Sequence, residues 1–221
     1  MKQALLIGPI FDEHSCAHLK KMCALEGYVH VIAVDGGADF CSLANVIPTL
    51  FVGDGDSAST EGLAYIKERQ VESVCVDAEK DDSDFALALD WLLNQGVSSF
   101  EAIGFIGGRL DHQLALLGET AVRKIDAEFF DELQSVWVVS QRGRLPRKVV
   151  MSPVEYQNFS VFALLEKAVV SVDGARWPLL KKELSPLISL GLSNEFGQGA
   201  FDARVLIHEG SAVICANKVA R

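Results

Sequence analysis

Short apolar runs alternate with longer amphipathic segments over the first 140 residues of the chain. The short runs are rich in branched side chains, which is typical of buried strands. We expect such strands at Ala4–Ile7, Val31–Val34, Thr49–Val52, Val74–Val76 and Ala102–Ile106. The other segments have apolar residues at helical spacing and predict helices near residues 14–25, 38–44, 60–70, 83–94 and 112–125. This alternation predicts an α/β domain whose parallel sheet is covered on both faces.

The pattern changes after Val136–Val139. The segment Gln141–Lys148 is basic and rich in turn-forming residues, so it looks like a boundary between domains. Beyond it helical periodicity is scarce, and only Pro178–Leu190 fits either a helix or a strand. Turn signals separate short strand-like runs at 159–164, 169–172, 204–208 and 212–215. We therefore expect an α/β domain over residues 1–140 and a small all-β sandwich domain over residues 145–221.

Composition narrows the class of protein. The chain has 221 residues, 49% of them hydrophobic, which is enough apolar material for a packed core. Thirty acidic residues against 20 basic ones give a formal charge of −10, which disfavours nucleic acid as a partner. A nucleotide bound together with a divalent cation stays compatible with that charge. No apolar stretch is long enough to predict a membrane span.

The five cysteines are odd in number and form no Cys-x-x-Cys pair. They therefore suggest neither a disulfide framework nor a zinc site, and a reducing, cytoplasmic setting is expected.

Polar clusters follow four of the predicted strands. They are Asp35-Gly36-Gly37, Gly53–Ser57, Lys80–Asp84 and Gly107–His112. In an open parallel sheet, ligands bind outside the carboxyl ends of the strands, so these clusters are expected along one rim.

The carboxylates of these clusters have two interpretations. Each aspartate or serine on its own is an ordinary residue for a turn or a helix N-cap, as at Asp82, Ser83 and Asp111. Several carboxylates on one rim would repel one another, which a divalent cation would offset. Oxygen ligands without His or Cys favour Mg²⁺ over zinc. The carboxylates concerned are those of Asp35, Asp54, Asp56, Asp81, Asp82, Asp84 and Asp111.

Glycines and one arginine suggest a place for phosphate. Gly36-Gly37 and Gly107-Gly108 each precede a predicted helix, where backbone N–H groups can meet an anion. Arg109 adds a bidentate donor for phosphate. His112 could contact phosphate or simply lie near the helix cap. Neither a P-loop nor a dinucleotide-binding glycine motif is present.

Taken together, these motifs resemble those of the thiamine pyrophosphokinase (thiamine diphosphokinase) family, over nearly the whole chain. The family's Asp-Gly-Gly, Gly-Asp-x-Asp-Ser, Lys-Asp-x-Thr/Ser-Asp and Gly-Gly-Arg-x-Asp-His segments occur in order. Later segments, Gly174–Leu179 and Ser193-Asn194-Glu195, look like two further family motifs. The matching segments of the first domain are 35–37, 53–57, 80–84 with Ala88-Leu89, and 107–112.

The resemblance implies a fold and an activity. The fold is a Rossmann-like, parallel-sheet nucleotide domain followed by a β-sandwich. The activity is transfer of the terminal pyrophosphoryl group of ATP to the hydroxyl of thiamine, giving thiamine diphosphate and AMP. The family acts as a homodimer whose sites lie between the α/β domain of one subunit and the β domain of the other.

The resemblance also implies roles for individual residues. Mg²⁺ is assigned to Asp54, Asp56 and Asp84. Catalysis is assigned to these three together with Arg109 and Asp81. Residues assigned to the nucleotide and its phosphates are Asp35, Gly36, Gly37, Lys80, Ser83, Gly107, Gly108, Asp111 and His112. The thiamine pocket is assigned to Trp177, Ser193 and Asn194, although Trp177 would equally suit the core of the sandwich.

Two positions depart from the family pattern. Gly55 replaces an aromatic residue between the metal-site carboxylates, and Leu116 replaces an asparagine four residues after His112. Two alternatives stay open, namely a pyrophosphokinase for another hydroxymethyl heterocycle such as a pterin, and a non-catalytic nucleotide-binding protein. The residue that acts as general base also stays open.

Overall fold

The computed structural model describes residues 4–25, 27–74 and 83–220. The chain divides into two compact units. The first comprises Met1–Leu116 with Phe129–Asp131, and the second comprises Leu117–Glu128 with Glu132–Arg221. Helix α5 (Leu110–Val122) and strand β6 (Asp126–Phe130) contain residues of both. No helix in the described part of the chain is long and apolar enough to cross a membrane.

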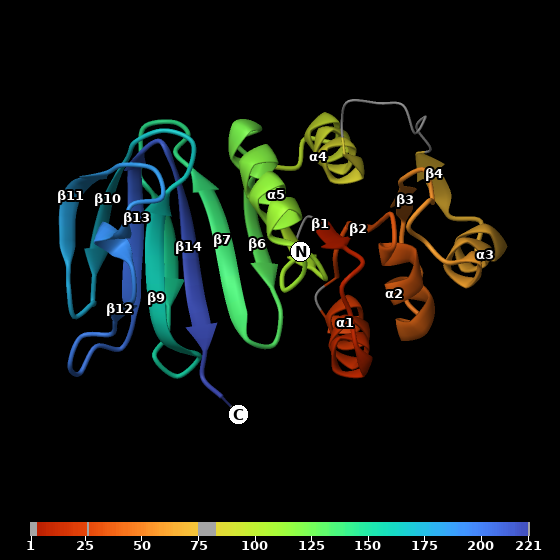
Figure 1. Ribbon diagram of the computed structural model, residues 1–221, viewed down its shortest axis with the longest axis horizontal. Helices are drawn as coiled ribbons and strands as arrows, with labels where there is room; N and C mark the ends of the chain where they lie inside the picture. Colours follow the sequence, from red (N-terminus) through yellow and green to blue (C-terminus); the bar gives the residue numbers. More distant parts are fainter. Residues whose placement is uncertain (1–3, 26, 75–82, 221) are drawn as a thin grey trace. The chain divides into compact units, whose positions relative to one another are not determined.

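The first unit contains a parallel sheet with strand order β5-β1-β2-β3-β4 (Figure 1). The parallel pairing expected for this part of the chain is therefore present. Its strands are β1 (Ala4–Ile7), β2 (His30–Val34), β3 (Leu50–Val52), β4 (Glu72–Val74) and β5 (Ser99–Ile103). Its helices, besides the start of α5, are α1 (Glu13–Leu25), α2 (Gly37–Ala44), α3 (Thr60–Glu68) and α4 (Asp84–Asn94).

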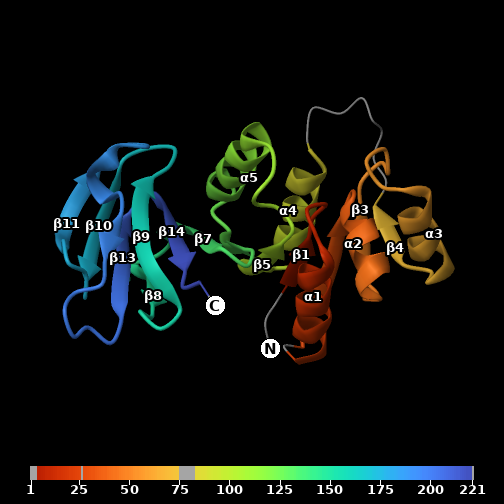
Figure 2. The ribbon, with the colours of Figure 1, turned by 60° about the horizontal axis from the view of Figure 1, so that its bottom comes forward.

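Alternate side chains of these strands face opposite layers of helices. Leu5 and Ile7 of β1 belong to a buried cluster that includes Leu19 of α1, Phe40 of α2 and Ile66 of α3. On the other face, α4 lies over the sheet (Figure 2). Its aromatic side chains contact rings of the strands. The contacting ring pairs there are Phe85 with Phe100 and Trp91 with His30. Both faces are therefore covered, which explains why the central strands β1 and β3 are apolar throughout.

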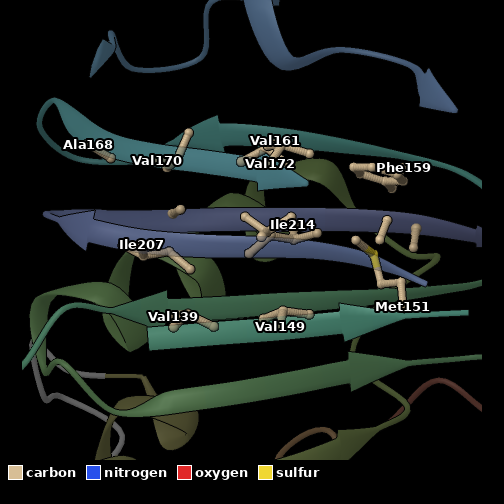
Figure 3. Packing of buried hydrophobic residues seen from close by; sticks show 14 of the residues in the cluster. Val139, Val149, Met151, Phe159, Val161, Ala168, Val170, Val172, Ile207 and Ile214 are labelled. Carbon is tan, nitrogen blue, oxygen red and sulfur yellow. The ribbon is translucent and has the colours of Figure 1, made fainter. Parts of the chain in front are cut away.

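The second unit contains antiparallel strands. One set has the order β12-β9-β14-β7, and a separate four-stranded sheet has the order β11-β10-β13-β8. Val161 and Ile214 of the first set and Val170 and Ile207 of the second point into one buried core (Figure 3). The strands are β7 (Gln134–Ser140), β8 (Arg147–Met151), β9 (Tyr156–Ala163), β10 (Ala168–Asp173), β11 (Leu179–Leu184), β12 (Asn194–Glu195), β13 (Ala203–Glu209) and β14 (Ser211–Lys218). A short 3-10 helix, η1, covers Ser189–Gly191.

Several elements differ from the sequence expectation. Helix α5 starts at Leu110 and ends at Val122, because Lys124 has a left-handed backbone and the chain then enters β6. The strand expected at Ala102–Ile106 ends at Ile103, since Gly104 has φ +81° and turns the chain out of the sheet. The undecided stretch Pro178–Leu190 contains strand β11 and the start of η1.

The basic segment is also structured. Its last residues, Arg147 and Lys148, are the first residues of strand β8. The Gln141 side chain stabilises the turn before β8, because it donates to the Leu145 carbonyl and accepts from the Arg147 N–H. Asp126, which is 7% exposed, forms ion pairs with Arg142 and Arg147. The segment thus connects β7 of one sheet to β8 of the other within the second unit, and Asp126 anchors it.

Candidate active site

Backbones approach closely where β1, β2 and β3 end. The Asp35 N–H donates to the Val52 carbonyl at 2.9 Å, and Asp35 has a left-handed φ of 48°. A Cβ added to Gly37 would overlap the Ile7 carbonyl oxygen, so only glycine fits there. Gly37 thus lets helix α2 start directly over the end of β1.

Three carboxylates gather at this edge. Asp35 follows β2, Asp54 follows β3 and Asp84 is the first residue of α4. One carboxylate oxygen from each lies within 4.8 Å of the other two. The carboxyl ends of two strands and the start of a helix therefore converge on one acidic cluster.

The environment of Asp35 suits a cation. Burial raises the pKa of its carboxyl, and the nearby charges of Asp84 and Asp56 add to the shift, while Ser57 opposes it. Among the described residues none donates a hydrogen bond to its buried Oδ1. A buried acceptor without a donor is costly, and a hard divalent cation would both satisfy it and offset the repulsion. The donor set, oxygen only, therefore fits Mg²⁺.

Asp56 lies close to the cluster but has local partners of its own. Its N–H donates to Asp54 Oδ1 at 3.0 Å, and its Oδ1 accepts from the Ser57 hydroxyl at 3.0 Å. The expected metal set of Asp54, Asp56 and Asp84 thus differs in one member from the trio that lies closest together. Asp35, which was expected to contact the nucleotide, lies together with Asp54 and Asp84 where Asp56 was expected.

The loop that carries Asp54 and Asp56 is fixed at its far end by Asp39. The Asp39 carboxylate, in the first turn of α2, accepts hydrogen bonds from the Ser59 N–H at 3.0 Å and from the Ser59 hydroxyl. Ser59 in turn caps helix α3 by accepting from the Gly62 N–H at 3.1 Å. Sequence reasoning missed Asp39, although it stands only two residues after Gly37.

Ser83 has the role of a helix cap. Its hydroxyl accepts from the Ala86 N–H at 3.2 Å at the start of α4, which is the alternative that the sequence left open for it. Ser83 thereby sets the position of Asp84 in the first turn. Lys80 and Asp81, assigned to phosphate and catalysis, lie outside the described residues, as do Asp82 and Cys75.

Arg109 and Asp111 form an exposed pair beyond β5. Arg109 donates from Nε to Asp111 Oδ1 at 3.1 Å and from NH2 to Oδ2 at 2.6 Å. Hydrogen bonds from Arg109 lower the pKa of Asp111 to about 2. Asp111 Oδ1 also accepts from the His112 N–H at 3.0 Å, within the first turn of α5. The guanidinium is thus pre-oriented and 72% exposed, available to an anion.

The two glycines before Arg109 differ from expectation in one respect. Gly107 has φ +95°, and its N–H, expected to face phosphate, donates to Oε1 of Gln113 at 3.3 Å. Gln113 is a second residue that sequence reasoning missed. A glutamine near the start of a helix is a typical capping residue, and that position was the available signal.

The residues expected to bind thiamine lie in the second unit. Asn194 is 5% exposed and holds the backbone of Trp177, accepting from its N–H at 3.1 Å and donating to its carbonyl at 2.7 Å. Trp177 is 51% exposed, and the Arg176 guanidinium lies 4.7 Å from the centre of its ring. Ser193 has a left-handed backbone and donates its N–H to the Ser160 hydroxyl. The trio therefore forms one local arrangement around an exposed tryptophan.

Comparison with known proteins gives consistent results. Residues 24–128 match the family described as the thiamin pyrophosphokinase catalytic domain. A thiamine pyrophosphokinase of Bacillus subtilis (strain 168) is 36% identical over 83 residues, which are 38% of this chain and 39% of that protein. The sequence match thus spans about two fifths of the relative's length.

Solved structures extend the similarity in fold to the whole chain. The thiamine pyrophosphokinase of B. subtilis has a TM-score of 0.73 at 22% identity, with all of both chains covered. The enzyme from Candida albicans has a TM-score of 0.71 at 12% identity, covering 99% of this chain and 90% of that one. Residues 24–128 are thus similar to the thiamin pyrophosphokinase catalytic domain, and the fold of the chain is similar to that of solved thiamin pyrophosphokinases.

Proposed function

We propose that this protein transfers the terminal pyrophosphoryl group of ATP to the hydroxyl of thiamine, giving thiamine diphosphate and AMP. The similarity of residues 24–128 to the thiamin pyrophosphokinase catalytic domain supports a role as a pyrophosphotransferase of thiamine diphosphate biosynthesis. The observation that carries the proposal is the cluster of Asp35, Asp54 and Asp84 at the carboxyl ends of the strands. The buried Asp35 Oδ1, which accepts no hydrogen bond from the residues that the structure describes, makes that cluster more than a set of helix caps.

We assign the metal to Asp54, Asp56 and Asp84, with Asp35 beside them. When bound, Mg²⁺ would neutralise charge on the phosphate oxygens. Arg109 binds the phosphate oxygens bidentately, and the glycine loops at 36–37 and 107–108 admit the phosphates close to the backbone. Asp111 holds the guanidinium in place.

The remaining assignments follow the family pattern. Lys80 and His112 belong to the phosphate side. One carboxylate accepts the hydroxyl proton, and Asp81 is among the candidates.

The thiamine pocket is proposed in the second unit, which we interpret as a β-sandwich. Thiazolium is a permanent cation, and an aromatic face attracts one. The Arg176 guanidinium above Trp177 illustrates this preference. Asn194 and Ser193 would shape the pocket around that ring.

A homodimer with shared sites is part of the proposal. Leu187, Ile188, Leu190 and Leu192 are each more than half exposed around η1, and a second copy of the chain would shield them. Cys16, Cys23, Cys41 and Cys215 are free thiols, which suits the proposed reducing cytoplasm.

A single assay tests the proposal. Purified protein is incubated with ATP, Mg²⁺ and thiamine, and AMP and thiamine diphosphate are measured. Equal amounts of both products are expected. Turnover with a hydroxymethyl pterin but not with thiamine would favour the other pyrophosphokinase, and nucleotide binding without either product would favour a non-catalytic protein.

A further inference from the structure

Gln113 contacts three successive backbone residues with one side chain. Its Oε1 accepts from the Gly107 N–H at 3.3 Å. Its Nε2 donates to the Gly108 carbonyl at 2.9 Å and to the Arg109 carbonyl at 3.4 Å. The amide of Gln113 thus uses both its acceptor and its donor on the loop that presents Arg109.

This loop needs a support of that kind. Two consecutive glycines have more backbone freedom than any other pair of residues, so the loop loses much entropy when it is ordered. Gly107 in addition has φ +95°. The Arg109–Asp111 pair fixes the guanidinium relative to α5 but leaves the backbone of Gly107 and Gly108 to other contacts.

We propose that Gln113 is a positioning residue for the transfer reaction. It holds the backbone of Gly107–Arg109 so that the Arg109 guanidinium meets the phosphates without first ordering the loop. The inference rests on the function proposed above. Nothing in the proposal requires Gln113 itself to touch a substrate. Displacing a positioned donor by a small distance is enough to slow a reaction severely.

The simpler alternative is that Gln113 only stabilises the start of α5. The chain offers a matched control for this, because Gln141 braces a turn of the second unit in the same way. Its Nε2 donates to the Leu145 carbonyl at 2.8 Å, and its Oε1 accepts from the Arg147 N–H at 3.1 Å. Gln141→Ala removes equivalent hydrogen bonds, and none of them is to the loop Gly107–Arg109.

The experiment compares Gln113→Ala with Gln141→Ala. Both are expected to lower the melting temperature by a similar few degrees, because each removes side-chain hydrogen bonds to a turn. Only Gln113→Ala should lower kcat, by about tenfold, with the KM for thiamine unchanged. Equal kcat values in the two variants would overturn the proposal.

A double-mutant cycle gives a readout that a purely structural role would not move. If Gln113 acts through Arg109, Gln113→Ala should lower kcat much less in an Arg109→Lys background than in the wild type. Fully additive losses would contradict this route.

The outcome also separates this inference from the proposed function. If the wild type does not convert thiamine, the proposed function fails, and binding of Mg·ATP is measured by calorimetry instead. Weaker binding in Gln113→Ala than in Gln141→Ala would still support the positioning role. Equal binding would overturn it.

Discussion

Asp35 and Asp54 follow different strands, yet each brings a carboxylate oxygen to within 4.8 Å of the other. The cause is parallel pairing of β2 with β3, which ends both strands at the same edge. The backbone also holds the two segments close together, since a Cβ on Gly53 would lie only 3.1 Å from the Asp35 Cα. Two like charges are thus held together by strand register rather than by any attraction between them.

This relationship predicts the effect of charge removal. Asp54→Asn and Asp56→Asn should nearly abolish turnover and leave the fold intact. Without Mg²⁺, Asp54→Asn should have an unchanged or higher melting temperature, because repulsion at the cluster falls. With Mg²⁺, the wild type should gain thermal stability that Asp54→Asn does not gain.

Asp202→Asn is the control for this series, because Asp202 pairs with Arg204 in the second unit. Near-wild-type turnover of Asp54→Asn at ordinary Mg²⁺ concentration would refute the metal assignment. Comparing Asp35→Asn with Asp56→Asn then decides which of the two carboxylates binds the metal more directly.

Most of the first unit could be predicted from the sequence. Helices α2, α3 and α4 start within about one residue of expectation because their starts carry local signals, such as the Ser59 and Ser83 caps. Strand β6 was missed because Asp126–Phe130 mixes charged and aromatic residues, and its character depends on tertiary pairing. Strand β11 falls in the stretch left undecided between helix and strand, because its residues Lys181 to Glu183 are polar and exposed.

The site could be predicted only in part. Motif order placed the aspartates on one rim, because that follows from parallel topology alone. Motif order could not tell whether Asp35 or Asp56 joins Asp54 and Asp84 in the acidic cluster. That depends on a left-handed backbone at Asp35 and on the local hydrogen bonds of Asp56. Asp39 binds Ser59, which lies 20 residues along the chain, and no sequence motif records such a contact. For Gln113 the only signal was its position near the start of a helix.

Arg109→Lys should lower turnover by about a hundredfold, with a smaller effect on the KM for thiamine. A lysine keeps the charge but loses the planar pair of donors that Asp111 now orients. Steady-state kinetics with each substrate varied in turn provide the test. If only the KM for thiamine changed, Arg109 would have to be assigned to the acceptor.

Two glycine substitutions should have opposite effects on stability. Gly37→Ala places a Cβ against the Ile7 carbonyl oxygen and should lower the free energy of unfolding by about 1–3 kcal/mol. Gly118→Ala lies inside α5 with no heavy atom within 4 Å of the added Cβ. It should raise that free energy by about 0.5–1 kcal/mol through helix propensity. Urea unfolding measures both changes. If Gly37→Ala left the free energy of unfolding unchanged, the close approach of α2 to the end of β1 would not restrict residue 37 to glycine.

Stability should fall in alkaline solution as buried thiols ionise. Burial raises the pKa of Cys23 and of Cys215 to about 11, against 9.0 for a free thiol. The neutral thiols therefore contribute stability that is full below pH 9 and is lost as the pH rises through 11. Melting temperatures between pH 8 and 11 test this, and Cys215→Ala should flatten the decline. If the melting temperature fell as steeply with pH in Cys215→Ala as in the wild type, titrating groups other than Cys215 would cause the fall.

The proposed sharing of active sites between subunits predicts complementation between inactive variants. Asn194→Ala is a poor choice of lesion, because its buried amide holds both the N–H and the carbonyl of Trp177. Trp177→Ala removes an exposed ring instead. Mixing Asp54→Asn with Trp177→Ala and allowing subunits to exchange should restore about a quarter of wild-type activity. Half of the dimers are then mixed, and each mixed dimer has one site with both lesions and one with neither.

Asp54→Asn mixed with Arg109→Ala is the matched control. Both lesions lie in the first unit, so no mixed dimer has an intact site and no activity should return. If the first mixture also stays inactive, although mass measurement confirms exchange, each site is built within a single chain.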